Sequence, residues 1–239
     1  MKAKLLPILC MVLTFIACEP NEPTQQPKFD LNTTSISMYV GDSKSLDIVS
    51  DLDYSLKSND LFVASITSNN KVKAEHVGKT SISVSNGQKT LTCEVEVLAK
   101  YHPFTEPFIP DSKGCLLNTM WNYNESHGFE FYEEASTTEY QIYKGKEPNV
   151  YFIYYFDASG YITELRMVFY DVNKYEQSIY NYTQERFKYL GIEDGVYKYC
   201  NTYNSFDATL KVTLGTYTDG TNTFVMLVYT PLAGNNINI

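Results

Sequence analysis

Hydrophobic and polar residues alternate in short runs along residues 29–99, and turn residues separate the runs. Ile36, Met38 and Val40 alternate with polar neighbours before a Gly41-Asp42 turn. Further runs of this kind lie at 62–66, 71–74, 80–84 and 91–97. A period of two residues is typical of strands with one buried face, and no window here shows a sustained helical period. Residues 29–99 are therefore predicted to form an all-β sandwich.

Residues 103–239 show both periods and predict an α+β domain. A first helix is expected to start after Asp111 or Ser112 as N-cap and to include Cys115, Leu116, Met120 and Tyr123. A second helix, with Gly191 as its C-cap, is expected where six residues recur every three or four positions: Val172, Tyr175, Ile179, Tyr182, Arg186 and Leu190. Strands are expected at 129–134, 139–143, 150–156, 161–169, 196–202, 207–216 and 222–229. The order αββββαβββ predicts an antiparallel sheet with helices on one face.

Six short segments of residues 29–99 follow the order of a known family. They are Tyr39-Val40-Gly41-Asp42, Ser58-Asn59, Val63-Ala64-Ser65-Ile66, Lys71-Val72-Lys73-Ala74, the run 78–84 and the run 93–97. In these segments the chain resembles the bacterial group 2 immunoglobulin-like (Ig-like) domain. It departs from the family at Leu56, where a tryptophan is usual, and at Asn70-Lys71, where a glycine is expected. The resemblance implies a stalk or adhesin module on a bacterial surface.

The C-terminal part carries a hairpin motif, Tyr-x-Phe-Asp-x-x-Gly, at residues 154–160. In this motif it resembles the C-terminal halves of exported Bacteroidetes-type lipoproteins of unknown function. The resemblance implies no activity.

The first residues have the layout of an export signal. Lys2 and Lys4 precede an apolar run at 5–16, which is shorter than the roughly 20 residues of a membrane-spanning helix. Ala17-Cys18 after Phe15-Ile16 resembles the lipobox of bacterial lipoproteins, although Phe15 stands where leucine is usual. The resemblance implies cleavage after residue 17 and a lipid on Cys18. The alternative is an ordinary secretory signal. Residues 18–28 are rich in proline and predict an extended linker.

The charge of the chain excludes some partners. The formal net charge is −9, and it becomes −11 when Lys2 and Lys4 leave with the signal. Nucleic-acid binding depends on Lys and Arg side chains, so no nucleic-acid partner is expected. Contact with the membrane is expected through the lipid alone. Glu19 and Glu22 resemble an acidic tag that directs some lipoproteins outward, so the expected location is the outer membrane, on its periplasmic or, preferably, its surface face.

Candidate catalytic and metal-binding residues are few. His76, His102 and His127 are the only histidines, and no G-x-S-x-G motif accompanies them. Glu125, His127 and Glu130 come closest to a metal cluster, but their spacing fits a helix end better than a metal site. We predict no catalytic residue, no metal and no cofactor. Cys93 is expected to be buried, whereas Cys115 and Cys200 are either free or paired.

Paired carboxylates do not predict a glycosidase. Glu133 and Glu134 lie in a predicted strand, where adjacent side chains point to opposite faces. Glu193-Asp194-Gly195 is a turn signal.

Tyrosines are the most unusual feature, because almost all of the 21 lie in the C-terminal part. In the strand at 150–156, Tyr151, Ile153 and Tyr155 share one face, and Phe152, Tyr154 and Phe156 share the other. Helices can cover only one of these faces. Either the tyrosines fill a core or they form a surface for a glycan or an envelope protein.

The sequence therefore predicts a lipid-anchored, non-enzymatic binding or structural protein. One alternative is a glycan-binding component of a surface nutrient-uptake system. Another is an envelope enzyme or enzyme inhibitor that acts through the C-terminal domain.

Overall fold

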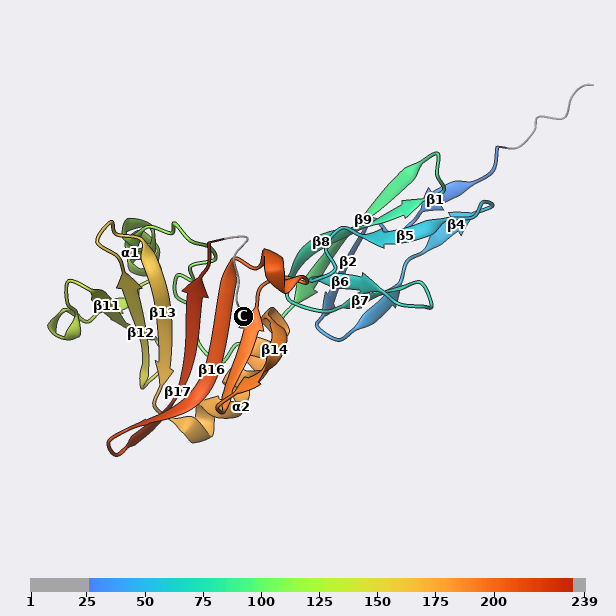
Figure 1. The fold of residues 1–239 in the computed structure, drawn as a ribbon. Coiled ribbons are helices and arrows are strands. Elements are labelled where there is room, and N and C mark those ends of the chain that lie inside the picture. The colour runs from blue at the N-terminus through green and yellow to red at the C-terminus, as the bar shows by residue number, and fades with distance from the viewer. Residues whose placement is uncertain (1–25, 234–239) are drawn as a thin grey trace, which may run out of the picture.

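The computed structural model describes residues 26–233. The predictions for the signal at 1–17, for Cys18 and for most of the linker lie outside the described residues. The described chain is mostly β-structure, with an eight-stranded sheet and two α-helices (Figure 1). Its buried apolar side chains form two clusters, one between Phe29 and Val97 and the other between Phe104 and Tyr229.

Three small sheets enclose the first cluster. Strands β2, β9, β8 and β5 form a four-stranded sheet, β3, β7 and β6 form a three-stranded sheet, and β1 pairs with β4. Their bounds are β1 Phe29–Leu31, β2 Ser35–Tyr39, β3 Ser43–Ser45, β4 Ile48–Ser50, β5 Ser55–Ser58, β6 Ala64–Ile66, β7 Lys71–Ala74, β8 Gly78–Ser85 and β9 Thr90–Leu98. β2 and β9 are parallel, and the other pairs are antiparallel.

The alternation in the sequence identified the strands that contribute most to this cluster. Val72 and Ala74 point inward from β7, and Cys93 points inward from β9, where it is fully buried as predicted. β3 gave no signal because its sequence, Ser-Lys-Ser, is polar and exposed throughout. Pairing with β7 makes it a strand, and pairing is a tertiary property.

Residues 117–231 form the eight-stranded antiparallel sheet and its two helices. The strand order is β10-β11-β12-β13-β17-β16-β15-β14. The bounds are α1 Leu117–Ser126, β10 Glu130–Phe131, β11 Tyr140–Lys144, β12 Val150–Phe156, β13 Ile162–Phe169, α2 Val172–Arg186, β14 Lys188–Glu193, β15 Val196–Cys200, β16 Leu210–Asp219 and β17 Asn222–Pro231. Two short 3-10 helices lie in the connections: Glu133–Ala135 between β10 and β11, and Ser205–Asp207 between β15 and β16.

The sheet consists of two equivalent halves. Helix α1 precedes the meander β10 to β13, and α2 precedes the meander β14 to β17. The last strands of the two meanders pair with each other, with Leu165 opposite Tyr229 and Phe169 opposite Val225. The chain therefore repeats one αββββ unit, and the two units meet along the β13–β17 pair.

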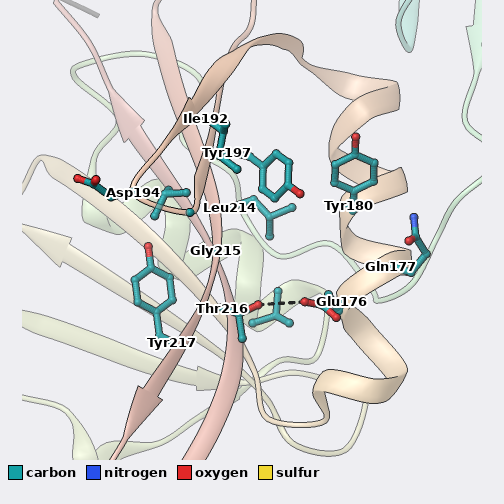
Figure 2. A pocket seen from close by; sticks show the side chains of 13 residues that line it. Glu176, Gln177, Tyr180, Ile192, Asp194, Tyr197, Leu214, Gly215, Thr216 and Tyr217 are labelled. Carbon is teal, nitrogen blue, oxygen red and sulfur yellow. Dashed lines mark hydrogen bonds between the residues drawn. The ribbon is translucent and has the colours of Figure 1, made fainter.

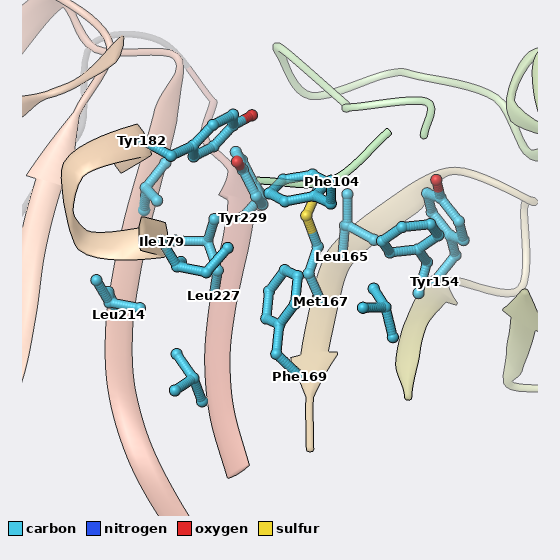
Figure 3. Close-up of a cluster of buried hydrophobic side chains, with 14 of the residues drawn as sticks. Phe104, Tyr154, Leu165, Met167, Phe169, Ile179, Tyr182, Leu214, Leu227 and Tyr229 are labelled. Atoms are coloured by element: carbon cyan, nitrogen blue, oxygen red, sulfur yellow. The ribbon is translucent and has the colours of Figure 1, made fainter. Parts of the chain in front are cut away.

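The second cluster of buried side chains lies between this sheet and its helices (Figure 3). Ile179 and Tyr182 of α2 contribute to it from the helix side, and Leu165, Met167 and Leu227 contribute from the sheet. Phe104 packs between the layers, with its ring centroid 4.8 Å from that of Tyr182 and 5.2 Å from that of Phe169.

The predicted end of the second helix was wrong. Helix α2 ends at Arg186, and Phe187 is extended, with φ −136° and ψ 143°. Residues 188–193 form β14, in which Gly191 occupies an irregular position in the pairing with β15 and is not a C-cap. The position of Leu190 fits the apolar spacing of the helix, but this residue lies in a strand. Apolar spacing alone cannot show whether a segment pairs with another strand.

The predicted start of the first helix was also wrong. The N-cap is Leu116, which is extended, makes no side-chain cap and forms an isolated bridge with Tyr161. The side chains of Asp111 and Ser112 bond to each other instead. The strand predicted at 129–134 is short, since β10 stops at Phe131 and Glu133 starts a 3-10 turn.

Candidate functional site

The two faces of the eight-stranded sheet have different environments. Both helices lie on one face, here called the inner face, where Phe152 and Tyr154 are fully buried. On the opposite, outer face, Tyr151, Ile153 and Tyr155 are half-buried, and no helix among residues 26–233 covers them (Figure 1). The predicted separation of the β12 side chains into two faces is therefore confirmed.

Four aromatic rings form a continuous row across the outer face. The ring centroids of Tyr151 and Tyr170 are 5.9 Å apart, those of Tyr170 and Phe224 are 5.5 Å apart, and those of Phe224 and Tyr217 are 6.2 Å apart. Tyr151 belongs to β12, Tyr170 directly follows β13, Phe224 belongs to β17 and Tyr217 belongs to β16. We call Tyr151, Tyr170, Phe224 and Tyr217 the outer aromatic row.

A cavity of about 310 Å³ adjoins the outer aromatic row. Its lining combines apolar side chains of the sheet with aromatic walls and one amide: Ile142, Ile153, Val168, Tyr132, Tyr151, Tyr170 and Asn149. This volume lies at the lower end of the range of small-ligand sites. A concave apolar site with tyrosine hydroxyls and one amide suits an amphipathic ligand.

Two pairs of opposite charges lie on the outer face beside β11 and β13. Lys144 pairs with Glu130 and lies 4.7 Å from the ring centroid of Tyr132. Arg166 pairs with Glu164, with 2.6 Å between Nε and Oε1. Such pairing leaves little net charge beside the row, so this face suits an uncharged ligand better than an ion.

A second and larger cavity, of about 550 Å³, lies beside α2 and β16 (Figure 2). We call it the edge cavity. Helix α2 contributes Glu176, Gln177 and Tyr180, and β16 contributes residues 214–217. The turn between β14 and β15, with Asp194 and Gly195, closes one end.

The local structure explains the placement of the edge-cavity side chains. The Asp171 carboxylate caps α2 by accepting the backbone N–H of Lys174 at 3.1 Å, which fixes where the helix starts. One turn later, Glu176 accepts the Thr216 hydroxyl at 3.3 Å. Tyr180 packs edge-on against Tyr197 of β15, with 5.3 Å between ring centroids. The turn at 193–195 agrees with its sequence signal, and Asp194 has a φ of +50°.

The candidate catalytic and metal-binding residues named from the sequence do not come together in one site. His127 stacks on Tyr123 at 3.9 Å at the end of α1, and Glu130 pairs with Lys144. Among the described residues, no three His, Cys, Asp or Glu side chains form a group that could hold a metal ion. His76 stacks on Phe62, far along the chain from His102 and His127.

Two further sequence predictions concern cysteines and carboxylates. Cys115 and Cys200 are free, so the possible disulfide between them is not formed. Glu133 and Glu134 lie in a 3-10 turn rather than a strand, so the argument that they point to opposite faces does not hold. Both side chains are exposed to solvent.

Sequence reasoning missed the edge cavity. Its residues lie in three separate segments, around 176–180, 192–197 and 214–217, and only folding brings them together. A weak signal existed in Tyr180, which lies within α2 but outside the apolar positions used to predict that helix. No helix of the described residues has the length and apolar character needed to cross a membrane.

Comparison with known proteins gives only distant similarity. No protein-family model and no curated protein sequence matches the chain. Among solved structures, S-layer protein rSbsC(31-844) matches with 13% identity and a TM-score of 0.28, over 84% of this chain and 21% of that one. Thus the chain spans about a fifth of that S-layer protein. Domains 5-6 of SbsC match over 88% of both chains, with 13% identity and a TM-score of 0.28. Human protocadherin-24 EC1-2 matches over 88% of this chain and 98% of that one, with 14% identity and a TM-score of 0.25. At these TM-scores the similarity does not establish a shared fold.

Proposed function

We propose that this chain is a lipid-anchored, non-enzymatic binding protein of the bacterial cell envelope. In this proposal the lipid is on Cys18, residues 29–99 form an Ig-like stalk, and residues 103–239 form an α+β domain that carries the binding surface. The signal-like residues 1–17 and the proline-rich linker support the anchor. The separate core of residues 29–97 and its strand alternation support the stalk.

The outer aromatic row is the observation that carries the binding function. A folded domain normally covers both faces of a sheet when both are rich in aromatic side chains. Here Tyr170 is 44% exposed and no helix of the described residues covers the row. Tyrosine rings with free hydroxyls contribute strongly to binding because each offers a large apolar area and a polar group.

The ligand that this surface fits best is a glycan. The charged groups around it are paired, and its remaining groups are rings, hydroxyls and one amide, which match the alternating apolar and hydroxyl faces of sugars. A protein partner is the alternative. Trp121 lies on α1, away from the outer face, so tyrosine rather than tryptophan emission is expected to respond to a sugar.

The test uses the full mature chain and a double variant, Tyr151→Ala with Tyr170→Ala. Its control is Tyr203→Ala with Phe206→Ala, two exposed aromatic residues outside the outer aromatic row. Each protein is immobilised and exposed to envelope polysaccharide and envelope protein fractions. We expect the wild type and the control to retain polysaccharide and the outer-face variant to lose it, with unchanged circular dichroism.

Equal retention by the outer-face variant would show that the row is not the binding surface. Retention of the protein fraction alone would support binding but exclude the glycan. The anchor has its own test. Cys18→Ala should abolish acyl labelling and leave unprocessed precursor, whereas a normally cleaved and soluble product would contradict the proposal.

A further inference from the structure

Strand β16 has an edge that is open over half of its length. It pairs with β17 along all ten residues, from Leu210 to Asp219. Its pairing with β15 covers only Lys211 to Leu214. Along residues 215–219 the backbone groups that point away from β17 therefore have no strand partner among the described residues. Such an edge is a template for another strand.

The edge cavity lies along this open edge. Gly215, Thr216 and Tyr217 belong to its lining, and the turn at 193–196 ends beside them (Figure 2). A strand that continued the line of β15 past this turn would lie in the cavity. At about 3.4 Å per residue, the open part of β16 is about 17 Å long and offers room for about five added residues.

The lining of the edge cavity is acidic. Glu176 and Asp194 are its charged side chains, and no Lys, Arg or His contributes to it. Neither carboxylate forms a salt bridge within residues 26–233, although Glu176 accepts the Thr216 hydroxyl. Tyr180, Tyr197 and Tyr217 supply ring faces, which attract cations as well as apolar groups.

We infer that the edge cavity binds a short extended peptide segment with basic side chains, which adds to β16 as an additional strand. Backbone hydrogen bonds to residues 215–219 supply the orientation, as in other cases of strand addition. Glu176 and Asp194 favour Lys or Arg at alternate positions of the peptide. This site lies at a sheet edge and shares only Tyr217 with the outer aromatic row, so the inference concerns a second site beyond the proposed glycan surface.

Three synthetic peptides test the inference on the full mature chain. The probe is acetyl-Lys-Val-Lys-Val-Lys-amide. In the charge control, glutamate replaces each lysine, and in the backbone control, proline replaces each valine and removes its N–H. Binding is measured by calorimetry, and hydrogen exchange is measured for the segment that contains residues 215–219.

Two charge-matched protein variants complete the experiment. Glu176→Gln with Asp194→Asn removes both cavity charges, and Glu133→Gln with Glu134→Gln removes two exposed charges in the loop beside β11. We expect the lysine peptide to bind the wild type and the loop variant, and to slow exchange at 215–219. We expect the cavity variant to bind it about tenfold more weakly, as the loss of two partly solvated ion pairs implies.

The other outcomes overturn the inference. Equal binding of the proline peptide would exclude strand addition, and equal binding of the glutamate peptide would exclude the charge preference. Equal weakening in both protein variants would show attraction to the net charge of the chain alone. Absence of binding at millimolar peptide would exclude the site.

Discussion

The carboxylate of Glu185 accepts the backbone N–H of Lys100 with both oxygens, at 2.9 and 3.1 Å. It also accepts the N–H of Tyr101 at 3.0 Å, and the Glu185 carbonyl accepts the N–H of Val77 at 2.8 Å. Glu185 lies in the last turn of α2 and is only 5% exposed. One side chain thus joins the second core to the segment that leaves the first.

Glu185→Ala is expected to destabilise this junction. The change removes a buried carboxylate that accepts two backbone N–H groups, and hydrogen bonds to charged groups contribute about 1.5–3 kcal/mol each. Urea unfolding should show the loss, and limited proteolysis should become faster around residues 99–103. Glu134→Ala, which removes an exposed carboxylate, is the control. Unchanged stability and proteolysis in Glu185→Ala would show that the junction does not depend on this side chain.

His76 is expected to make the stability depend on pH. Burial lowers its pKa below the usual value of 6.5, although the Phe62 carbonyl and the Glu75 charge oppose this effect. The unfolded chain therefore binds the proton more readily than the folded chain. Stability is then full above about pH 6.5 and decreases as the pH falls towards the folded pKa.

The measurement is the free energy of unfolding between pH 5 and pH 8. His76→Gln should flatten the part of this curve below pH 6.5, whereas the exposed His127→Gln should not. A curve of the same slope in both variants would mean that other groups cause the dependence.

The backbone of Phe108 is held on both sides, and two substitutions test this. Its N–H donates to Asn124 Oδ1 at 3.0 Å, and its carbonyl accepts the Tyr154 hydroxyl at 2.7 Å. Tyr154→Phe should cost about 1 kcal/mol, and Asn124→Leu about 1–3 kcal/mol because it leaves the N–H unpaired. Thermal unfolding measures both. A larger loss of stability in Tyr154→Phe than in Asn124→Leu would contradict the larger contribution expected from the Asn124 hydrogen bond.

The difference between the two sheet faces predicts unequal effects of truncation. Leu165 of β13 points to the inner face and is fully buried, whereas Ile153 of β12 points to the half-buried outer face. Leu165→Ala should cost about 2–5 kcal/mol. Ile153→Ala should cost less than half as much, because part of its side chain already contacts water. Equal losses in urea unfolding would indicate that the outer face is covered in solution, and would argue against the proposed glycan surface.

Alkaline titration should divide the tyrosines into two groups. Burial raises the pKa of Tyr143 to about 12, and it raises the pKa values of Tyr154 and Tyr199 still further. Folding therefore favours the neutral phenols, and stability decreases as the pH rises above about 10. Absorbance at the phenolate band should show an early phase from exposed tyrosines. A later, cooperative phase should coincide with unfolding measured by circular dichroism. A single non-cooperative phase near pH 10 would contradict the claim that burial raises the pKa values of these tyrosines.

The pattern of apolar and polar residues was sufficient to locate an element where one of its faces is buried and the other is not. Alternation located β7 and β12 to the residue, and it assigned Tyr151 and Phe152 to opposite faces. It did so because side-chain direction in a strand has a period of two, whatever the strand's partner. The two-helix, mainly β architecture followed from the same local periods.

Only the tertiary structure decided features that depend on pairing between distant segments. The end of α2 and the presence of β14 depend on hydrogen bonds to β15, and Leu190 fits either a helix or a strand by its spacing. The covered face, the open edge of β16 and the contact from Glu185 to Lys100 each require residues far apart in sequence to meet. The sequence by itself determined which residues can be buried, since that depends on local chemistry and period. Packing determined which surfaces remain open for binding, because an edge or a face is defined by the neighbours that it lacks.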